Sequence, residues 1–235
     1  MTISENRSGS KARRNISIGL ALITWLLALA ANSSADDLVP LKPKLPEPAF
    51  VGTPKDAPAG TNIEGPSTKP RAPLMIPRDA KNIAPAAKLS TSDTNATPDK
   101  LAKIIDGNKE ANDASVILLR KGVQYVQFDL GAENEIFAIV IWHAHDSPKV
   151  YHSVVAQVAD DADFTKNVRT LFNNDTANNC GRGAGTDREY FETFEGKTID
   201  AKGAKARYLR LYSKGSTDSS LNEYTEVEIY GRPSP

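Results

Sequence analysis

The side chains best suited to chemistry lie together in the segment Trp-His-Ala-His-Asp, from Trp142 to Asp146. Alternate residues of an extended strand point to the same side, so His143 and His145 can face one another. With Asp146 or His152 they would offer the imidazole and carboxylate ligands that suit a transition metal. No acidic residue stands at a spacing typical of metal-dependent hydrolases. We therefore keep a metal-dependent enzyme as an alternative hypothesis only.

The same segment also suits a saccharide. An aromatic ring can stack on the apolar face of a pyranose while neighbouring polar groups bind its hydroxyls. Trp142 could be that ring or a core residue, and His145 with Asp146 could equally form a solvated turn before Pro148. Several connections between predicted strands would contribute. The predicted ligand-binding residues are Trp142, His143, His145, Tyr151, Arg182, Asn222 and Tyr224.

Short runs of alternating apolar residues, separated by Gly, Asn and Asp, predict the strands that position these side chains. Residues 135–142 are apolar on both faces, which is typical of a central strand covered from both sides. No stretch of ten residues has a helical apolar period, so we expect few helices. The predicted runs are 102–105, 115–119, 123–130, 135–142, 153–159, 168–172, 189–194, 207–212 and 224–230.

These eight or nine antiparallel strands predict an all-β fold, a two-sheet jelly-roll β-sandwich over residues 86–235. Its inward side chains should include Leu209, Leu211, Val227 and Ile229. The connection 172–185 is rich in Asn, Asp and Gly, so we expect a long flexible loop that could offer Arg182 to a ligand. About 150 residues are enough to bury one core.

Two segments precede the predicted sandwich. Residues 1–35 combine a basic start, an apolar run at 16–31 and small residues before Asp36. This pattern predicts a secretory signal peptide, with a retained anchor as the alternative because the run is short for a membrane span. The protein should then be secreted, periplasmic or in the cell envelope, with no membrane span after signal cleavage.

Residues 36–85 hold eleven of the fifteen prolines and few large apolar side chains. Proline supplies no amide donor, and the segment offers little apolar area to offset the entropy of ordering. We predict a disordered Pro-rich linker that acts as a semi-extended spacer.

Charge and cysteine content exclude some functions. Without residues 1–35 the chain is mildly acidic and has no basic stripe to follow phosphates, so we expect no nucleic-acid partner. Cys180 is the single cysteine, which excludes an internal disulfide and a cysteine-rich zinc site.

Three regions resemble the discoidin-type, galactose-binding-like superfamily, which includes coagulation-factor C domains and many bacterial carbohydrate-binding modules. Residues 105–108 (Ile-Asp-Gly-Asn) are similar to its opening turn, and residues 126–131 to its strand end with Asp-Leu-Gly. Residues 206–211 and 226–231 are similar to its two last strands. Order and spacing agree over nearly all of residues 86–235, so the resemblance implies the same β-sandwich.

The resemblance also implies one structural Ca²⁺ between the Asp-Gly-Asn loop and the last strand. Asp106, Asn108 and Glu226 match the family's ligand positions, and Asp113 and Ser115 could substitute for a missing Thr or Ser. The loop departs from the family pattern because it is longer and lacks the usual Trp. The alternative is a plain turn with a solvated Asp106.

The sequence as a whole favours a non-catalytic carbohydrate-binding module that attaches to glycans outside the cytoplasm. Because this fold serves sugars, lipids and proteins alike, an envelope protein-protein interaction module without a sugar site is the alternative.

Overall fold

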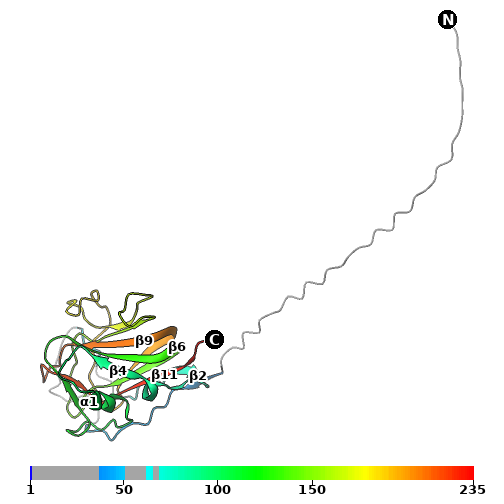
Figure 1. The fold of residues 1–235 in the computed structure, drawn as a ribbon. Helices are drawn as coiled ribbons and strands as arrows, with labels where there is room; N and C mark the ends of the chain where they lie inside the picture. Colours follow the sequence, from blue (N-terminus) through cyan, green and yellow to red (C-terminus); the bar gives the residue numbers. More distant parts are fainter. Residues whose placement is uncertain (2–36, 51–61, 66–68) are drawn as a thin grey trace. The chain divides into compact units, whose positions relative to one another are not determined.

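A long strand, β6 (Gln124–Trp142), is the centre of the fold in the computed structural model (Figure 1). It joins the two predicted runs 123–130 and 135–142 into one element. The structure describes Met1 and residues 37–50, 62–65 and 69–235, so the predicted signal peptide lies outside the described residues. No helix among the described residues is long and apolar enough to cross a membrane.

Among the described residues, the largest sheet has seven strands, and two pairs of short strands accompany it. All pairings between named strands are antiparallel, as expected. The strands of the large sheet lie in the order β3-β11-β6-β9-β7-β8, and β4 also pairs with β6. Their bounds are β3 (Lys81–Asn82), β4 (Lys88–Thr91), β7 (Val155–Ala159), β8 (Arg169–Asn173), β9 (Lys197–Ser213) and β11 (Glu226–Pro233). The pairs are β5 (Ile117–Leu119) with β10 (Asn222–Tyr224) and β1 (Leu38–Pro40) with β2 (Met75–Pro77).

The main core lies on one face of the large sheet and includes side chains of β5 and β10. The four predicted inward residues of β9 and β11 are fully buried there, which confirms the period-two pattern. The second half of β6 is also buried on both faces, as predicted. Ile139 and Ile141 belong to the main core, while Val140 and Trp142 belong to a second cluster on the opposite face.

Two predicted strands are wrong. Residues 102–105 belong to helical turns, α1 (Pro98–Ala102) and η2 (Lys103–Ile105), because Pro98 begins a helix and Leu101 and Ile104 both face the core. A further helical turn, η1 (Ala84–Ala86), precedes β4. Residues 189–194 contain no strand, and their contacts with other segments are isolated bridges.

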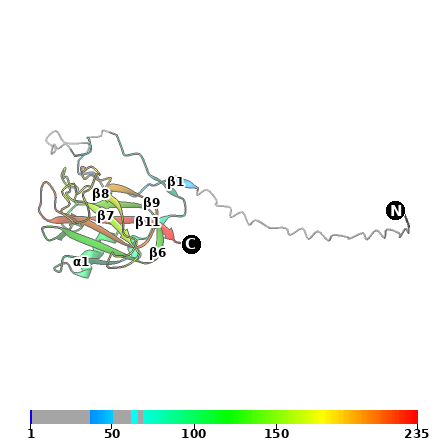
Figure 2. The same cartoon turned by 90° about the horizontal axis from the view of Figure 1, so that it is seen from above.

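The proline-rich segment is the largest correction. We call its described parts, residues 37–50, 62–65 and 69–85, the strap. Instead of a disordered spacer, the strap supplies β1 (Figure 2), β2 (Figure 1) and β3. The short strand β3 pairs with the last strand. Leu41 and Ile76 are buried in the second cluster beside Trp142. The prolines tolerate this extended backbone, and the few apolar side chains between them are enough to bind it to the sheet. The folded part therefore begins before residue 86.

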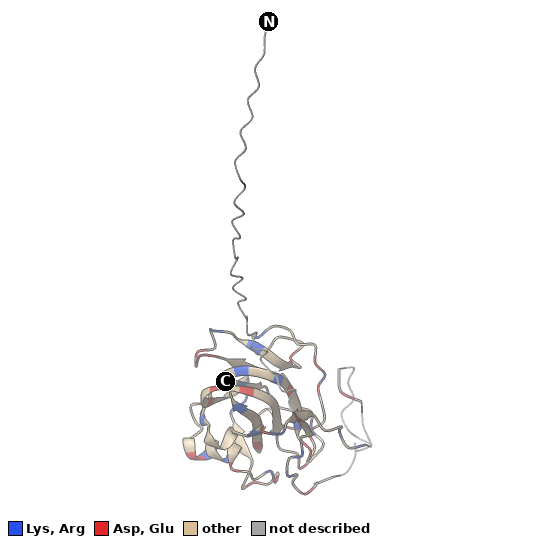
Figure 3. Cartoon of the chain, turned by 90° about the vertical axis from the view of Figure 1, so that its right-hand side faces the viewer, with Lys and Arg blue, Asp and Glu red and all other residues tan. Residues whose placement is uncertain are grey.

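Basic and acidic residues are interspersed along the described strands and loops (Figure 3). Several form cross-strand or loop-to-strand pairs, for example Arg207 with Asp129 at 2.7 Å.

Candidate functional site

Three of the predicted ligand-binding residues, His143, Tyr151 and Tyr224, come together, but inside the protein. The ring of His143 stacks on Tyr151 with centroids 4.2 Å apart and lies 4.8 Å from the ring of Tyr224. His143 Nδ1 is 2.8 Å from Glu192 Oε2, and both side chains are fully buried. We call His143, Tyr151, Glu192 and Tyr224 the His143 cluster. A ligand at the surface cannot reach it in this structure.

The two predicted metal-binding imidazoles do not share a partner. Because β6 ends at Trp142, strand alternation stops before His145, whose Nε2 donates to the Lys109 carbonyl at 2.8 Å. His152 pairs with Glu189 instead. No group of three or more His, Cys, Asp or Glu side chains in the described part of the chain is arranged to hold a metal ion. In the part of the chain that the structure describes, His143, His145 and His152 therefore do not form a shared metal site.

Trp142 is a core residue and not a stacking platform. Its side chain is fully buried, and its Nε1 donates to the Phe194 carbonyl at 2.9 Å. Gly196 has a positive φ and lies so close that a Cβ there would be 2.8 Å from the Trp142 ring. The ammonium of Lys109 is 5.0 Å from the ring centroid. No open ring face remains for a sugar.

The other predicted ligand residues also serve the fold. The Asn222 side chain is buried and donates to the carbonyls of Arg120 and Gly122, so it clamps two loops together. Arg182 is exposed, but it lies over the ring of Tyr212, on the outer face of the large sheet.

Next to the His143 cluster, Tyr151, Glu223, Lys149 and Asp146 form a chain of hydrogen bonds and ion pairs. The Tyr151 hydroxyl donates to Glu223 Oε2 at 2.7 Å, and burial raises the pKa of Tyr151 far above its usual value. The Lys149 ammonium binds both Glu223 and Asp146, at 3.2 and 2.8 Å. Sequence reasoning missed Glu192, Glu223 and Lys149 because nothing in their local sequence marks them as partners of residues far along the chain.

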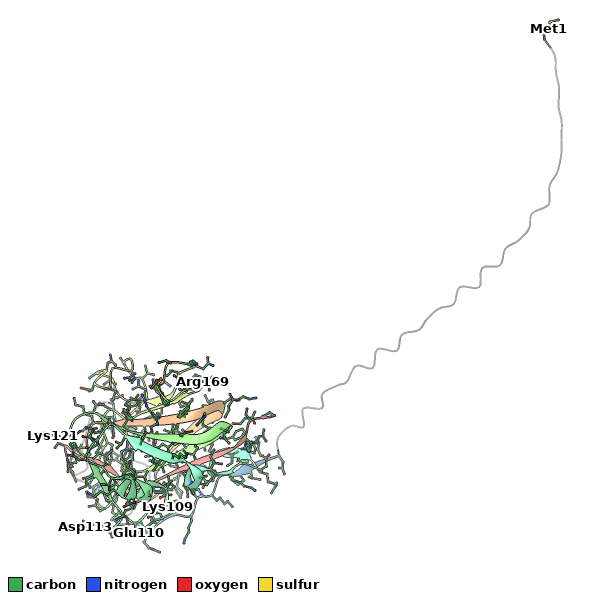
Figure 4. All side chains as sticks on the ribbon, in the orientation of Figure 1. Met1, Lys109, Glu110, Asp113, Lys121 and Arg169 are labelled. Carbon is green, nitrogen blue, oxygen red and sulfur yellow. The ribbon has the colours of Figure 1, made fainter. Side chains whose placement is uncertain are left out.

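Four of the five predicted calcium ligands do converge, and we call Asp106, Asn108, Ser115 and Glu226 the Asp106 corner. The Gly107 amide donates to Glu226 Oε2 at 3.1 Å, and Asn108 Nδ2 donates to Ser115 Oγ at 2.9 Å. The Asn108 amide donates to Asp106 Oδ1 at 2.8 Å. Asp113 is exposed and makes no hydrogen bond to these four among the described residues (Figure 4).

The donor set of the Asp106 corner does not fit Ca²⁺. This ion takes six to eight oxygen ligands, usually with several carboxylates. Here an ammonium occupies the same region, because Lys109 Nζ lies 2.8 Å from Glu228 Oε1 and both side chains are buried. Burial raises the pKa of Glu226 to about 8, while the Gly107 amide and the Lys109 ammonium act in the opposite direction. The longer loop without the usual Trp was the signal in the sequence that this loop differs from the family's calcium loop.

A surface pocket of about 310 Å³ lies between the strap and the same loop. The strap contributes Lys44, Leu45 and Pro46, and the loop contributes residues 106–110. The Glu47 amide also approaches Glu110 Oε1, at 3.4 Å. Sequence reasoning missed this pocket because one wall belongs to the segment predicted as a spacer. The apolar residues of the strap, Leu41, Leu45, Leu74 and Ile76, were the available signal.

The fold defines an antiparallel β-sandwich, and the solved structures that match it include CBM32 modules, which have the galactose-binding-like fold expected from the motifs. One is described as CpGH89CBM32-6 produced by Clostridium perfringens. It is 16% identical, with a TM-score of 0.43, over 64% of this chain and 99% of that chain. A chitosan-binding module 1 from a chitosanase/glucanase of Paenibacillus sp. IK-5 is 17% identical, with a TM-score of 0.44, over 64% and 99%.

The CBM32 of AlyQ in complex with 4,5-unsaturated mannuronic acid is 21% identical, with a TM-score of 0.39, over 60% of this chain and 92% of that chain. Scores and identities this low say nothing of what this chain binds. No protein-family model and no curated protein matches the chain.

Proposed function

We propose that this chain is a non-catalytic carbohydrate-binding module of an exported protein that attaches to glycans outside the cytoplasm. The pocket between the strap and the 106–110 loop carries the proposal. Its volume is at the lower end of the range for small-molecule sites. Acceptors on Asp106 and Glu110 and the ammonium of Lys44 suit sugar hydroxyls, while Leu45 and Pro46 offer apolar surface to a ring.

The burial of the His143 cluster supports binding without catalysis. The His143 cluster contains the kinds of residue that transfer protons, but its members are at most 1% exposed. A general base must come within hydrogen-bond reach of the proton it removes. Substrate has no such access to His143 or Glu192, so binding without turnover is the function that the geometry supports.

Binding of the full chain to a glycan array tests the proposal. The array should contain β-galactosides together with plant and cell-wall polysaccharides. We expect binding to at least one glycan, weakened about tenfold or more by Lys44→Ala or Glu110→Ala, since tenfold corresponds to the loss of about one good hydrogen bond. Lys121→Ala removes an exposed lysine elsewhere and should leave binding unchanged (Figure 4). Absence of binding to every glycan contradicts the function, and binding that is insensitive to both pocket variants contradicts the location.

A second candidate function is docking of a protein partner in the cell envelope. Leu38 and Met75 are 51% and 49% exposed on the paired strands β1 and β2, where apolar side chains gain by being covered. Pull-down from envelope extract with the wild type and with Leu38→Asp tests this candidate. A partner retained equally by both proteins argues against these strands as the contact.

A further inference from the structure

Lys109 connects three parts of the fold that are far apart in sequence. Its backbone carbonyl accepts from His145 just after β6, and its ammonium is 5.0 Å from the Trp142 ring centroid at the end of that strand. The same ammonium binds Glu228 of β11 at 2.8 Å. One residue of the 106–110 loop therefore ties that loop to the central strand and to the last strand.

The carboxylates near Lys109 already have partners. Glu228 Oε1 binds the Lys109 ammonium, and its Oε2 accepts from the Tyr230 hydroxyl at 2.7 Å. Glu226 Oε2 accepts from the Gly107 amide. A cation entering here would have to compete with the Lys109 ammonium for Glu228, and it would meet a buried positive charge beside these acids.

From this arrangement we infer that Lys109 does the work of a divalent cation, so that this module locks its 106–110 loop to its last strand without calcium. A buried ammonium with a buried carboxylate is a charge-balanced pair, and further contacts to Trp142 and His145 fix its position. The inference does not depend on which ligand the pocket binds. If Lys109 replaces the cation, the stability of the protein should not change with calcium concentration and should depend on Lys109.

Thermal unfolding of the full chain in excess CaCl₂ and in EDTA tests the inference. We expect the same Tm in both, within about 1 °C, and no stoichiometric Ca²⁺ uptake in equilibrium dialysis. Lys109→Met keeps the aliphatic stem and removes the charge. It should lower the Tm by roughly 6–20 °C, because it leaves Glu228 buried without its partner. Lys121→Met, at an exposed position, should change the Tm by less than about 2 °C.

Two further variants separate the charge from the packing. The double variant Lys109→Met with Glu228→Gln should regain at least about half of the lost Tm, because it removes the unpaired carboxylate as well. Lys109→Met alone should gain Tm on addition of CaCl₂, since the acids near it have lost their ammonium. A wild-type Tm that rises by several degrees in calcium, with one bound Ca²⁺, overturns the inference. If Lys109→Met does not fold, the wild-type Tm in CaCl₂ and in EDTA and the Tm of the double variant still test the inference.

Discussion

The His143 cluster and the Asp106 corner each contain a buried glutamate, yet only the Asp106 corner reaches the surface. Both bring together residues that are far apart in the sequence. The His143 cluster is at most 1% exposed. The Asp106 corner lies beside a pocket that Asp106 and Asn108 help to line. One became a structural core and the other keeps a surface that can meet a ligand.

The difference arises from what covers each region. The segment carrying Glu192 lies over the His143 cluster through the bridge between Val150 and Phe191. The strap adds a second layer there, since Ile63 bridges to Glu189. At the Asp106 corner the strap passes only beside the loop and leaves a pocket between them. Whether a ligand can reach a polar cluster therefore depends on the segments that cover it, which lie before or after it in the sequence. It does not depend on the strand that carries the cluster.

The strongest test of this comparison is Trp142→Ala, because Trp142 directly precedes His143 and its ring centroid lies 5.0 Å from the ammonium of Lys109 in the 106–110 loop. We expect a loss of about 3–5 kcal/mol in the free energy of unfolding, measured by urea denaturation. The fully buried ring would leave a cavity, and its bond to the Phe194 carbonyl would be lost. Glycan affinity of the folded variant should stay within about threefold of wild type, since the ring does not line the pocket.

Trp142→Phe is the matched control and should cost less than the alanine variant, because most of the ring volume remains. A Trp142→Ala variant with normal stability and lost glycan binding would return Trp142 to the ligand site and contradict the core assignment.

The next test concerns the strap, which separates the covered region from the open one. Ile76 and Met75 are neighbours in β2, but Ile76 is 4% exposed and Met75 is 49% exposed. Ile76→Ala should lower the free energy of unfolding by about 2–4 kcal/mol, because Ile76 packs in the cluster that contains Trp142. Met75→Ala should cost less than about 1 kcal/mol. Urea denaturation measures both.

Equal and small losses for the two variants would mean that the strap is not bound to the sheet. The prediction of a disordered spacer would then hold in solution.

The sequence predicted those parts of the fold that depend on local periodicity. Alternation in residues 207–212 and 224–230 identified Leu209 and Val227 as inward residues, and both are fully buried. The apolar run 135–142 identified the central strand. The resemblance placed Glu226 beside the Asp-Gly-Asn loop, and the Gly107 amide does bind it. These features can be predicted from local patterns and motifs in the sequence, without knowing which distant residues are in contact.

The wrong sequence predictions concern the tertiary contacts of each element. Composition predicts poor secondary structure for a proline-rich segment, but it does not show whether Leu41 and Ile76 find a partner surface. Likewise, the spacing of His143 and His145 cannot show that Glu192 and Tyr151 enclose one imidazole. The Lys109 contact with Glu228 joins residues 119 positions apart, by their numbers in the chain. Such contacts arise only from the tertiary fold.

The smallest effect expected is a pH dependence that arises from the Asp106 corner. Burial raises the pKa of Glu226 to about 8 in the folded protein, above its value in the unfolded chain. The stability contributed by the protonated form is fully present below the unfolded pKa and is lost as the pH rises through about 8. The free energy of unfolding should therefore fall between about pH 6 and 7 by at most ~1.4 kcal/mol from this group.

Glu226→Gln isolates this contribution because its amide is neutral at every pH and its carbonyl can still accept from the Gly107 amide. The difference in free energy of unfolding between wild type and Glu226→Gln, measured in urea at several pH values, should grow in favour of the variant as the pH rises. Above about pH 8 it should level off, because both folded and unfolded wild type are then ionised. A difference that does not vary with pH would mean that Glu226 ionises alike in the folded and unfolded protein, and it would contradict the raised pKa.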